Sequence, residues 1–498
     1  MVGKNRQGGA VTRHNAYSLL LAIFVSAELL LPSNSIASEF SPPGLYQVER
    51  VTLPNGFDVV LKPRKGAHTL SLRLWVGVGT QDYPCDKQET PHFLEHLLFT
   101  GTSLYDEAEL DHLVADHGGS WNAYTANEET VYTMDIYSHF PGFAIDTLYA
   151  ILTDSQLTDE NIEISRDIIH RENGGKPTPV RKWFREQGFG VSGFEKGIFE
   201  LLPGANYVCK ELRTAENISR DDILDTYDTY YVPGNMALIV VGDFDRDQIM
   251  ARIHHTFGSI DASPPPQRML PDPGPPLAYS SQTGTFSPLL ATDATVWIMY
   301  RIPGFWSDDQ YPLLVIEQYL SFRINELIRI NRGLAYAPGT FRIELDNYGL
   351  FGVYADVDVN DAVTALALMR DEMQQLVEHP IDGELLEKAK MKILLQSVQG
   401  YESNADFADF YATDYIEIRK LGALVDDEAK IQAVNAADIA RVAKKYLSPQ
   451  LAVQIEEIPT LTYTQLYELI SVVFVLLLGV LVYFYLRLRA HNRRRPAG

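Results

Sequence analysis

The segment from His92 to His96 is the feature that most constrains the fold. It carries two imidazoles four residues apart, with the carboxylate of Glu95 between them. On an α-helix, residues four apart share a face, with Cβ atoms roughly 5–6 Å apart. Both rings can then bind one metal ion, and Glu95 can take a proton from a water molecule beside it. We therefore predict a helix with a metal centre; the alternative is a helix that carries two surface histidines.

The residues around this motif favour the helix. Apolar side chains at positions 93, 94, 97 and 98 recur at helical spacing, and Pro91 suits the first helical turn. Before it, residues 69–79 alternate in part and are rich in strand-forming types. The sequence thus predicts a strand followed by a helix that carries the metal ligands.

The H-x-x-E-H order reverses the commoner H-E-x-x-H order of zinc peptidases. From about residue 46 to about residue 457, the chain resembles the pitrilysin/insulinase-type (inverzincin) zinc metallopeptidases. Within them it is most similar to the two-domain branch that includes mitochondrial processing peptidase. The resemblance implies that Zn²⁺ is the cofactor, that His92 and His96 are ligands, and that Glu95 is the catalytic base.

The third ligand of the family is a glutamate about 76 residues beyond the second histidine, inside an E-R-x-V-I-x-x-E pattern. The segment from Ser165 to Glu172 resembles this pattern, which implies that Glu172 is the third ligand. The first position is usually a glutamate that supports the ligands, and here it is Ser165. Loss of such support can cost about 10–100-fold in metal affinity or activity. We expect His170, next to the pattern's end, to be a surface side chain.

Two further segments resemble the family. Residues 118–125 match its G-G-x-x-N-A-x-T segment, which implies an edge strand that pairs with extended substrate, with Asn122 and Ala123 near the scissile bond. The alternative is an ordinary glycine turn before a strand. Residues 329–336 match R-x-x-x-G-L-x-Y, which implies that Arg329 and Tyr336 bind substrate and polarise its carbonyl. The alternative is a helix-end arginine and a half-buried tyrosine.

Both ends of the chain predict export and a membrane anchor. Basic residues, an apolar stretch and a small-residue site ending at Ala37 predict a signal peptide over residues 1–37, unless the stretch is a retained anchor. Residues 469–486 are uncharged and, as a helix, would measure about 27 Å, so we predict a transmembrane helix over 468–487. The arginine-rich tail, 488–498, then lies in the cytoplasm. The catalytic body is expected on the periplasmic side of the cytoplasmic (inner) membrane; a buried core helix is the alternative.

Charge and cysteine content exclude other classes of site. The net charge is −23, and about −30 without the basic ends, so we expect no nucleic-acid partner. The two cysteines, Cys85 and Cys209, are too few for a cysteine zinc site. An exported location would allow them to pair, but the sequence leaves this open.

The chain has the pattern of a duplication. Residues 218–233 are echoed by residues 434–449, and each copy precedes an apolar run. We predict an α+β fold of two duplicated domains, with mainly antiparallel sheets covered by helices, plus the C-terminal transmembrane helix. The first, zinc-bearing domain spans 45–260, a proline-rich linker spans 263–288, and the second domain spans 289–460. Pairing residues 312–318 with residues 91–96 gives the second domain no histidine pair, so we expect no metal there.

The resemblance implies an exported, membrane-anchored zinc metalloendopeptidase that hydrolyses extended or unfolded polypeptides through a zinc-activated water. Full family assemblies enclose substrate between four such domains, and this chain supplies two. A partner is therefore expected, either a second copy in a homodimer or a related peptidase-like subunit in a heterodimer. The alternative is a non-catalytic peptidase-like subunit or scaffold of a membrane-associated protease complex.

Overall fold

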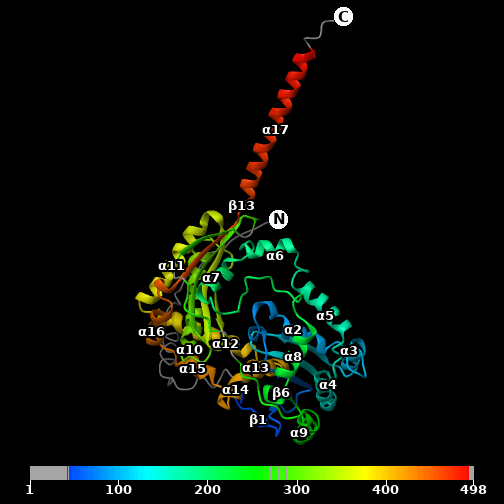
Figure 1. Ribbon diagram of the computed structural model, residues 1–498. Helices are drawn as coiled ribbons and strands as arrows, with labels where there is room; N and C mark the ends of the chain where they lie inside the picture. Colours follow the sequence, from blue (N-terminus) through cyan, green and yellow to red (C-terminus); the bar gives the residue numbers. More distant parts are fainter. Residues whose placement is uncertain (1–41, 43, 269–271, 278–280, 287–288, 493–498) are drawn as a thin grey trace, which may run out of the picture.

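Two units of sheet and helix make up the body of the protein, and a long helix extends away from it (Figure 1). This computed structural model describes residues 42, 44–268, 272–277, 281–286 and 289–492. The expected signal peptide, residues 1–37, and the last six residues of the basic tail lie outside the described residues.

The first sheet has six strands and belongs to the first half of the chain. Among its described strands, neighbours are antiparallel except for one parallel pair, β2 and β6. The strand order is β1 (Glu49–Thr52), β2 (Asp58–Pro63), β6 (Met236–Gly242), β3 (Thr69–Val76), β5 (Thr130–Tyr137) and β4 (Ser120–Thr125). Strand β4 therefore forms one edge of the sheet.

Helices cover one face of this sheet with their apolar sides. They bury a core of aliphatic and aromatic residues, in which Leu72, Leu94 and Leu238 are inaccessible to solvent. The helices are α2 (Thr90–Leu98), α3 (Glu107–Asp116), α4 (Pro141–Asp154), α5 (Asp159–Glu172), α8 (Arg220–Tyr230) and α9 (Arg246–His255).

The second sheet repeats the arrangement of the first. Its strand order is β7 (Ser281–Phe286), β12 (Val453–Ile458), β9 (Asp293–Pro303), β11 (Tyr348–Asp358) and β10 (Gly339–Glu344). Strands β7 and β12 are parallel and the other neighbours are antiparallel, as in the series β2, β6, β3, β5 and β4. The α+β class is confirmed, and the matching strand order agrees with the predicted duplication.

A second set of helices covers this sheet. They bury a separate apolar core that contains Val296, Ile316 and Phe351. The helices are α10 (Gln310–Ile324), α11 (Ala362–Glu378), α12 (Gly383–Gln399), α15 (Asp427–Ala433) and α16 (Ala436–Tyr446).

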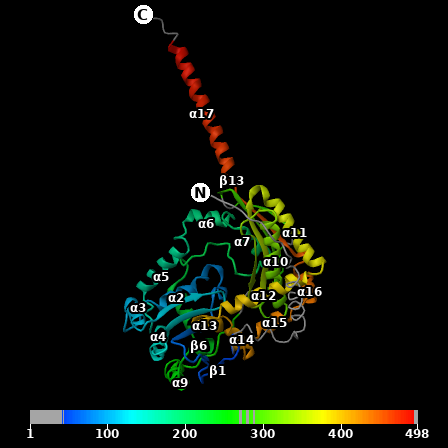
Figure 2. The same cartoon turned by 180° about the vertical axis from the view of Figure 1, so that it is seen from behind.

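Each half also covers the other half's sheet. Helices α13 (Asn404–Thr413) and α14 (Tyr415–Leu421) pack on the face of the first sheet opposite its own helices, near β6 (Figure 2). Helix α7 (Gly193–Leu201) packs on the second sheet, against Met299 and Ile455. The division into domains over 45–260 and 289–460 stays a prediction. Helices of each predicted domain pack on the sheet of the other.

The segment predicted as a proline-rich linker contains one strand. Residues 281–286 form β7, which pairs with β12 in the second sheet. This part of the segment lacks proline, so its amide groups are free to donate to a neighbouring strand. The proline-rich part that the structure describes, residues 263–268 and 272–276, has neither helix nor strand.

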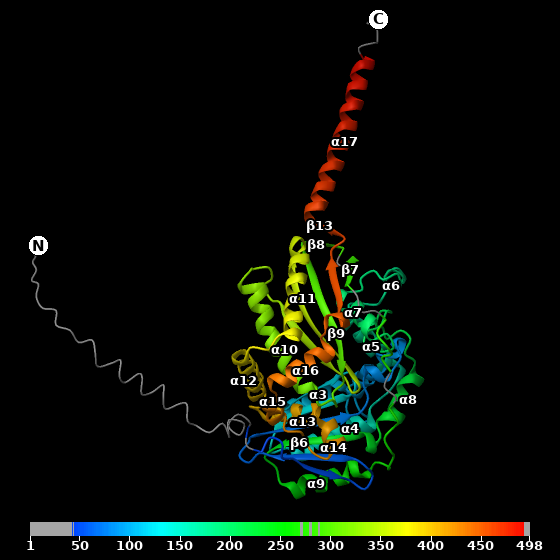
Figure 3. The same ribbon diagram turned by 90° about the vertical axis from the view of Figure 1, so that its left-hand side faces the viewer.

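The final helix, α17 (Tyr463–Asn492), leaves the body from one end (Figure 3). Among the described residues, Tyr463–Arg489 is the one helix that is long and apolar enough to cross a membrane, and none of it is buried. It contains the predicted span, 468–487. Strand β13 (Leu461–Thr462) pairs with β8 (Leu290–Ala291) and runs directly into α17, without a linker.

Candidate metal centre

Helix α2 carries the two histidines of the motif, as predicted from their spacing. Phe93, Leu94 and Leu97 are fully buried against the first sheet, which fixes the rotation of the helix. His92 and His96 therefore lie on the side that faces α5, where each ring keeps about a fifth to a quarter of its surface exposed. The predicted strand before α2 is β3.

Helix α5 brings a carboxylate to the same point. The helix begins after Thr158, whose hydroxyl accepts a hydrogen bond from the backbone N–H of Asn161. Ile162, Ser165 and Ile169 are buried along it, and the helix packs on α2. Glu172 is its last residue, so its side chain reaches the histidines while remaining about half exposed.

Three side chains converge between these helices. The Nε2 atoms of His92 and His96 are 3.1 Å apart. Glu172 Oε2 lies 3.4 Å from the first and 3.5 Å from the second. Ligand atoms of the three residues all lie within 4.8 Å of one another, so one ion could contact them all. Two imidazoles and one carboxylate form a donor set typical of catalytic zinc sites, and the exposure of Glu172 leaves one side accessible to water.

Glu95 lies beside this cluster but faces inward. It is 8% exposed, and its Oε2 accepts a hydrogen bond of 2.6 Å from the hydroxyl of Thr125, at the end of β4. Burial raises the pKa of Glu95, although the bond from Thr125 opposes this. A carboxylate with a raised pKa in this position is suited to accept and return a proton.

Glu89, just before α2, supports the first histidine. It is 2% exposed, and its Oε2 lies 2.7 Å from His92 Nδ1. Its Oε1 pairs with Arg213 Nε at 2.5 Å and accepts from Asn173 Nδ2 at 3.2 Å. Burial alone would raise the pKa of Glu89, but the bond with His92 and the charge of Arg213 outweigh it and lower the pKa. The ionised carboxylate thus accepts the Nδ1 proton of His92 and leaves Nε2 free for a metal.

The two histidines titrate differently. Burial, followed by the charge of His92, lowers the pKa of His96. Burial also acts against the charged form of His92, but its bond to Glu89 prevails and raises its pKa. Neutral imidazole is the metal-binding form, so proton uptake by His92 is expected to compete with a metal at low pH.

Glu89 was not predicted from the sequence. The family pattern has its supporting glutamate at position 165, where the chain has a buried serine on α5. The available signal was a carboxylate three residues before His92, a spacing that allows contact within one helical turn.

The expectation that His170 is a surface side chain was wrong: it is 4% exposed, and neither ring nitrogen has a hydrogen-bond partner among the described residues. The chain turns back at Gly174 and Gly175, whose N–H donates to the His170 carbonyl and brings the next loop over the helix end.

Comparison with known families separates the two halves. Residues 58–174 match the model described as "Insulinase (Peptidase family M16)", and residues 217–393 match "Peptidase M16 inactive domain". The chain belongs to the M16 peptidase family. The first match contains the His92, His96 and Glu172 cluster, and the second lies mainly in the half without a histidine pair.

Relatives agree with this M16 assignment. An uncharacterised zinc protease of Streptomyces coelicolor is 24% identical over 424 residues, which are 82% of this chain and 90% of that protein. The β-subunit of the mitochondrial processing peptidase of Lentinula edodes is 26% identical over 412 residues, covering 80% and 86%. A crystal structure of a protease from Helicobacter pylori has the same fold, with a TM-score of 0.67 at 19% identity over 82% of this chain and 99% of that one.

In this M16 fold, β4 lies at the sheet edge with Asn122 and Ala123 on it. Strand β4 pairs with β5 on one side, and no strand among the described residues pairs with its other side. Asn122 is exposed and Ala123 is half-buried. The Thr125–Glu95 hydrogen bond places the end of this edge beside the metal cluster. Their role in substrate binding remains a prediction.

Arg329 and Tyr336 lie in the second half, away from these contacts. Arg329 is in the π-helical turn η6 (Asn325–Ile330), and its guanidinium lies 4.7 Å from the centre of the Tyr336 ring. Tyr336 is 82% exposed, so the alternative of a half-buried tyrosine is wrong. Within the part of the chain that the structure describes, no hydrogen bond, ion pair or ring contact joins either residue to the metal cluster.

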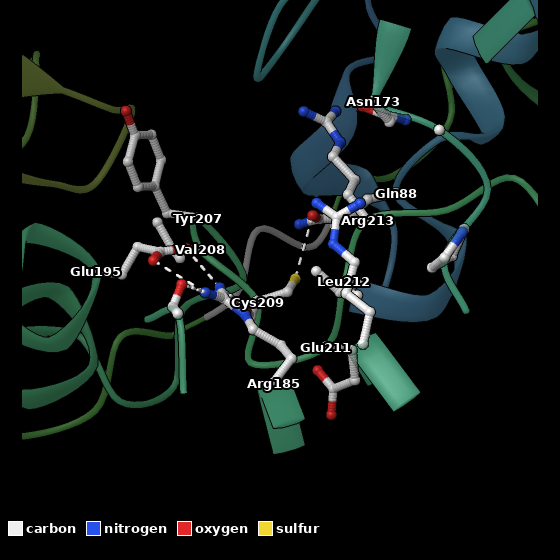
Figure 4. Close-up of a pocket in the computed structure, with 14 residues that line it drawn as sticks. Gln88, Asn173, Arg185, Glu195, Tyr207, Val208, Cys209, Glu211, Leu212 and Arg213 are labelled. Carbon is white, nitrogen blue, oxygen red and sulfur yellow. Dashed lines mark hydrogen bonds and ion pairs between the residues drawn. The ribbon is translucent and has the colours of Figure 1, made fainter. Parts of the chain in front are cut away.

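A pocket of about 370 Å³ is lined by Gln88, Asn173 and Arg213, among other residues (Figure 4). Arg213 and Asn173 line it and also contact Glu89, so the pocket shares two residues with the support of His92. The sequence did not settle whether Cys85 and Cys209 pair. In the structure they form a disulfide, which joins the loop around Cys209 that lines the pocket to the segment before α2. The pocket was not predicted from the sequence, because the residues that line it come from segments far apart in the chain.

Proposed function

We propose that this chain is an exported, membrane-anchored zinc metalloendopeptidase that hydrolyses peptide bonds of extended or unfolded polypeptides. The observation that carries the proposal is the convergence of His92, His96 and Glu172, with the buried carboxylate of Glu95 beside them. The names of the relatives agree with zinc as the cofactor. The donor set of two imidazoles and one carboxylate fits that ion.

In this proposal His92, His96 and Glu172 hold Zn²⁺. When bound, Zn²⁺ supplies a Lewis acid that polarises the substrate carbonyl and lowers the pKa of water. Glu95 takes the proton of the attacking water and delivers it to the amine that leaves. Thr125 holds the carboxylate of Glu95 in place, and Glu89 holds the ring of His92.

The free edge of β4 gives a way to bind substrate. An extended polypeptide would add to the sheet as a further strand, with Asn122 and Ala123 near the bond that is cleaved. Main-chain hydrogen bonds would then supply most of the recognition, so selectivity for sequence would be loose. Arg329 and Tyr336 would polarise the carbonyl from the opposite wall.

A second chain is part of this proposal. The chain carries both the metal cluster and the Arg329–Tyr336 pair, so two copies could each complete the other's site in a homodimer. A heterodimer with a related peptidase-like subunit is the other arrangement, and the fungal relative is itself named as a subunit.

Export and anchoring rest on three features. Residues 1–37 have the composition of a signal peptide, α17 has the length and apolar character of a span, and arginines follow it. The disulfide Cys85–Cys209 suits an oxidising compartment. We therefore place the catalytic body on the periplasmic side of the cytoplasmic membrane.

A non-catalytic, peptidase-like subunit is the second candidate. Ser165, at a position where the family usually has a supporting glutamate, favours it. The contact of Glu89 with His92 weakens this argument, because it supplies a carboxylate to the same ligand set from the residue just before α2.

The full chain, purified in detergent, tests these candidates. We expect it to contain zinc and to cleave casein, an unfolded polypeptide. The variant Glu95→Gln is expected to retain zinc and to lose cleavage by about 10²–10⁴-fold, the usual contribution of a general base. Cleavage by this variant at the parent's rate would contradict the assigned base. A folded parent without zinc would favour the non-catalytic subunit.

A further inference from the structure

Helix α6 (Pro179–Glu186) presents its charged side to the protein. Arg185 pairs with Glu195 and donates to the carbonyls of Lys210 and Cys209, 3.0 and 3.1 Å away (Figure 4). Lys182 pairs with Glu216. Arg185 and Lys182 are three positions apart on the helix, so these contacts fix which face of α6 is turned inward.

The opposite side of α6 is apolar and exposed. Val180, Trp183 and Phe184 share that face, with exposed fractions of 64, 55 and 45%. Phe189, just beyond the helix, is 54% exposed. The usual arrangement of a surface helix, with apolar residues inward, is therefore reversed.

Helix α6 also lacks the packing that normally stabilises a short helix. All of its eight residues are described, and none of them is buried. Helices shorter than about 12–15 residues are marginal in water without tertiary contacts. Thr178 caps its start, but a contact on the apolar face is what α6 needs to be stable.

The position of α6 indicates what makes this contact. In three views it lies at the end of the body from which α17 leaves, and it runs across the direction of α17 (Figures 1, 2 and 3). Strand β13 runs into α17 without a linker, so this end of the body faces any membrane that α17 crosses. Leu289, Tyr463 and Tyr467, near the base of α17, are exposed as well.

Charge at α6 also differs from that of the body. Residues 174–190 contain four lysines and arginines and one glutamate, a net charge of +3, whereas the whole chain carries −23. Two of these cations, Lys182 and Arg185, are paired with Glu216 and Glu195 on the inward side. Aromatic residues with basic neighbours are typical of helices at the interface between lipid headgroups and acyl chains.

We propose that α6 lies in the headgroup layer of the membrane that α17 crosses, with Val180, Trp183 and Phe184 inserted among the lipids. This inference rests on the proposed membrane anchor and adds a second contact between the body and phospholipid. Because α6 begins seven residues after Glu172, the contact fixes the orientation of the metal-bearing half relative to the bilayer.

The experiment uses the full chain in lipid discs of phosphatidylcholine and phosphatidylglycerol, with or without lipid brominated near the headgroup. Tryptophan emission is compared for the parent, Trp183→Phe and the control Trp306→Phe. Trp306 contacts Asp346 and Lys420, and Lys420 belongs to α14, which lies at the end of the body opposite α17 (Figure 1). We expect brominated lipid to quench the parent and the control, and the quenching to be lost in Trp183→Phe.

Two other results would overturn the inference while leaving the anchor intact. One is a chain that enters the discs but whose Trp183 is not quenched and remains open to aqueous iodide. The other is a Trp183 that is shielded from iodide but not quenched by lipid, because a protein surface, such as a second copy, would then cover α6. Failure of the chain to enter discs would contradict the proposed anchor and this inference together.

Hydrogen exchange gives a second readout that does not depend on Trp183 emission. In discs, the amides of α6 are expected to exchange more slowly in the parent than in the double variant Trp183→Ser/Phe184→Ser. Equal exchange would contradict insertion. Zinc content, measured in parallel, shows whether the double variant is folded.

Discussion

The two halves of the body share a strand order, but they use the space between two equivalent helices differently. In the first half, α2 and α5 direct His92, His96 and Glu172 toward one point. In the second half, α10 and α12 pack through apolar residues such as Leu320 and Leu386. The sheet and its covering helices thus do not need a metal to form. The proposed metal site belongs to one copy of the fold, so its removal should leave the structure intact.

The largest effect is expected from making the first half resemble the second. His92→Leu removes one of three ligands, so zinc affinity should fall by more than the roughly 10–100-fold typical of a supporting residue, and cleavage should be lost. The melting temperature of the zinc-free protein should change little, because the core on α2 lies on the helix's other side. Zinc titration and thermal unfolding of the full chain measure both quantities.

The reverse change is Leu313→His on α10, which places an imidazole in the second half, at a position that is fully buried in its core. We expect no second zinc ion, because α10 has no histidine of its own to complete a pair. Zinc binding by His92→Leu at the parent's affinity would contradict the assignment of His92 as a zinc ligand of the first half.

A smaller effect is expected at the Arg329–Tyr336 pair. If Tyr336 polarises the substrate carbonyl, Tyr336→Ala should reduce kcat by about 10²–10³-fold, as for other single donors to an oxyanion, and leave zinc bound. Co-expression of Tyr336→Ala with Glu95→Gln should restore part of the activity, because each chain of a homodimer would supply what the other lacks. A Tyr336→Ala chain that cleaves casein like the parent would contradict the role of the pair.

A still smaller effect is expected at Glu89, which supports a proposed zinc ligand without binding the metal itself. Glu89→Gln removes the charge that holds His92, and zinc affinity is expected to fall about 10–100-fold. Adding Ser165→Glu should recover part of this loss if the two positions serve the same ligand set, whereas a purely structural effect would not be rescued. Zinc titration of the parent, the single variant and the double variant checks this.

The smallest effect concerns the contact between the halves. Glu129 lines a pocket with Glu344 and Asp414 of the other half, and burial, followed by the charge of Glu128, raises its pKa to about 7. The ordinary pKa of a glutamate is about 4.5, so Glu129 in the unfolded state releases its proton first as the pH rises. The parent should therefore lose stability relative to Glu129→Gln between about pH 4.5 and 7, with little further change above. Melting temperatures across this range measure the difference; parallel curves would contradict the shift.

Much of the fold and the metal cluster could be predicted from the sequence because the relevant signals are local. Residues 92–96 specify a helix face through spacing alone, and the alternation in 69–79 predicted β3. The prediction that Glu172 is the third ligand needed a family pattern, because no local sequence signal shows that α5 packs against α2.

Other features depend on contacts between distant segments. The charged form of Glu89 is stabilised in part by Arg213, which the loop that contains Cys209 brings close to it. Helix α7 packs on the second sheet and α13 on the first, and the hydrophobic periodicity of these segments does not show which sheet each helix covers. The charge and apolar positions of α6 were visible in the sequence, but which face is turned outward depends on Glu195 and Glu216.

Anomalous diffraction at the zinc absorption edge, from crystals of the zinc-loaded full chain, is the most direct test of the proposed metal centre. We predict one zinc peak per chain, at about 2.0–2.2 Å from His92 Nε2, His96 Nε2 and a Glu172 carboxylate oxygen, and no peak in the second half. A peak that lacks Glu172 as a ligand, a peak between α10 and α12, or no peak at His92 and His96 would contradict it.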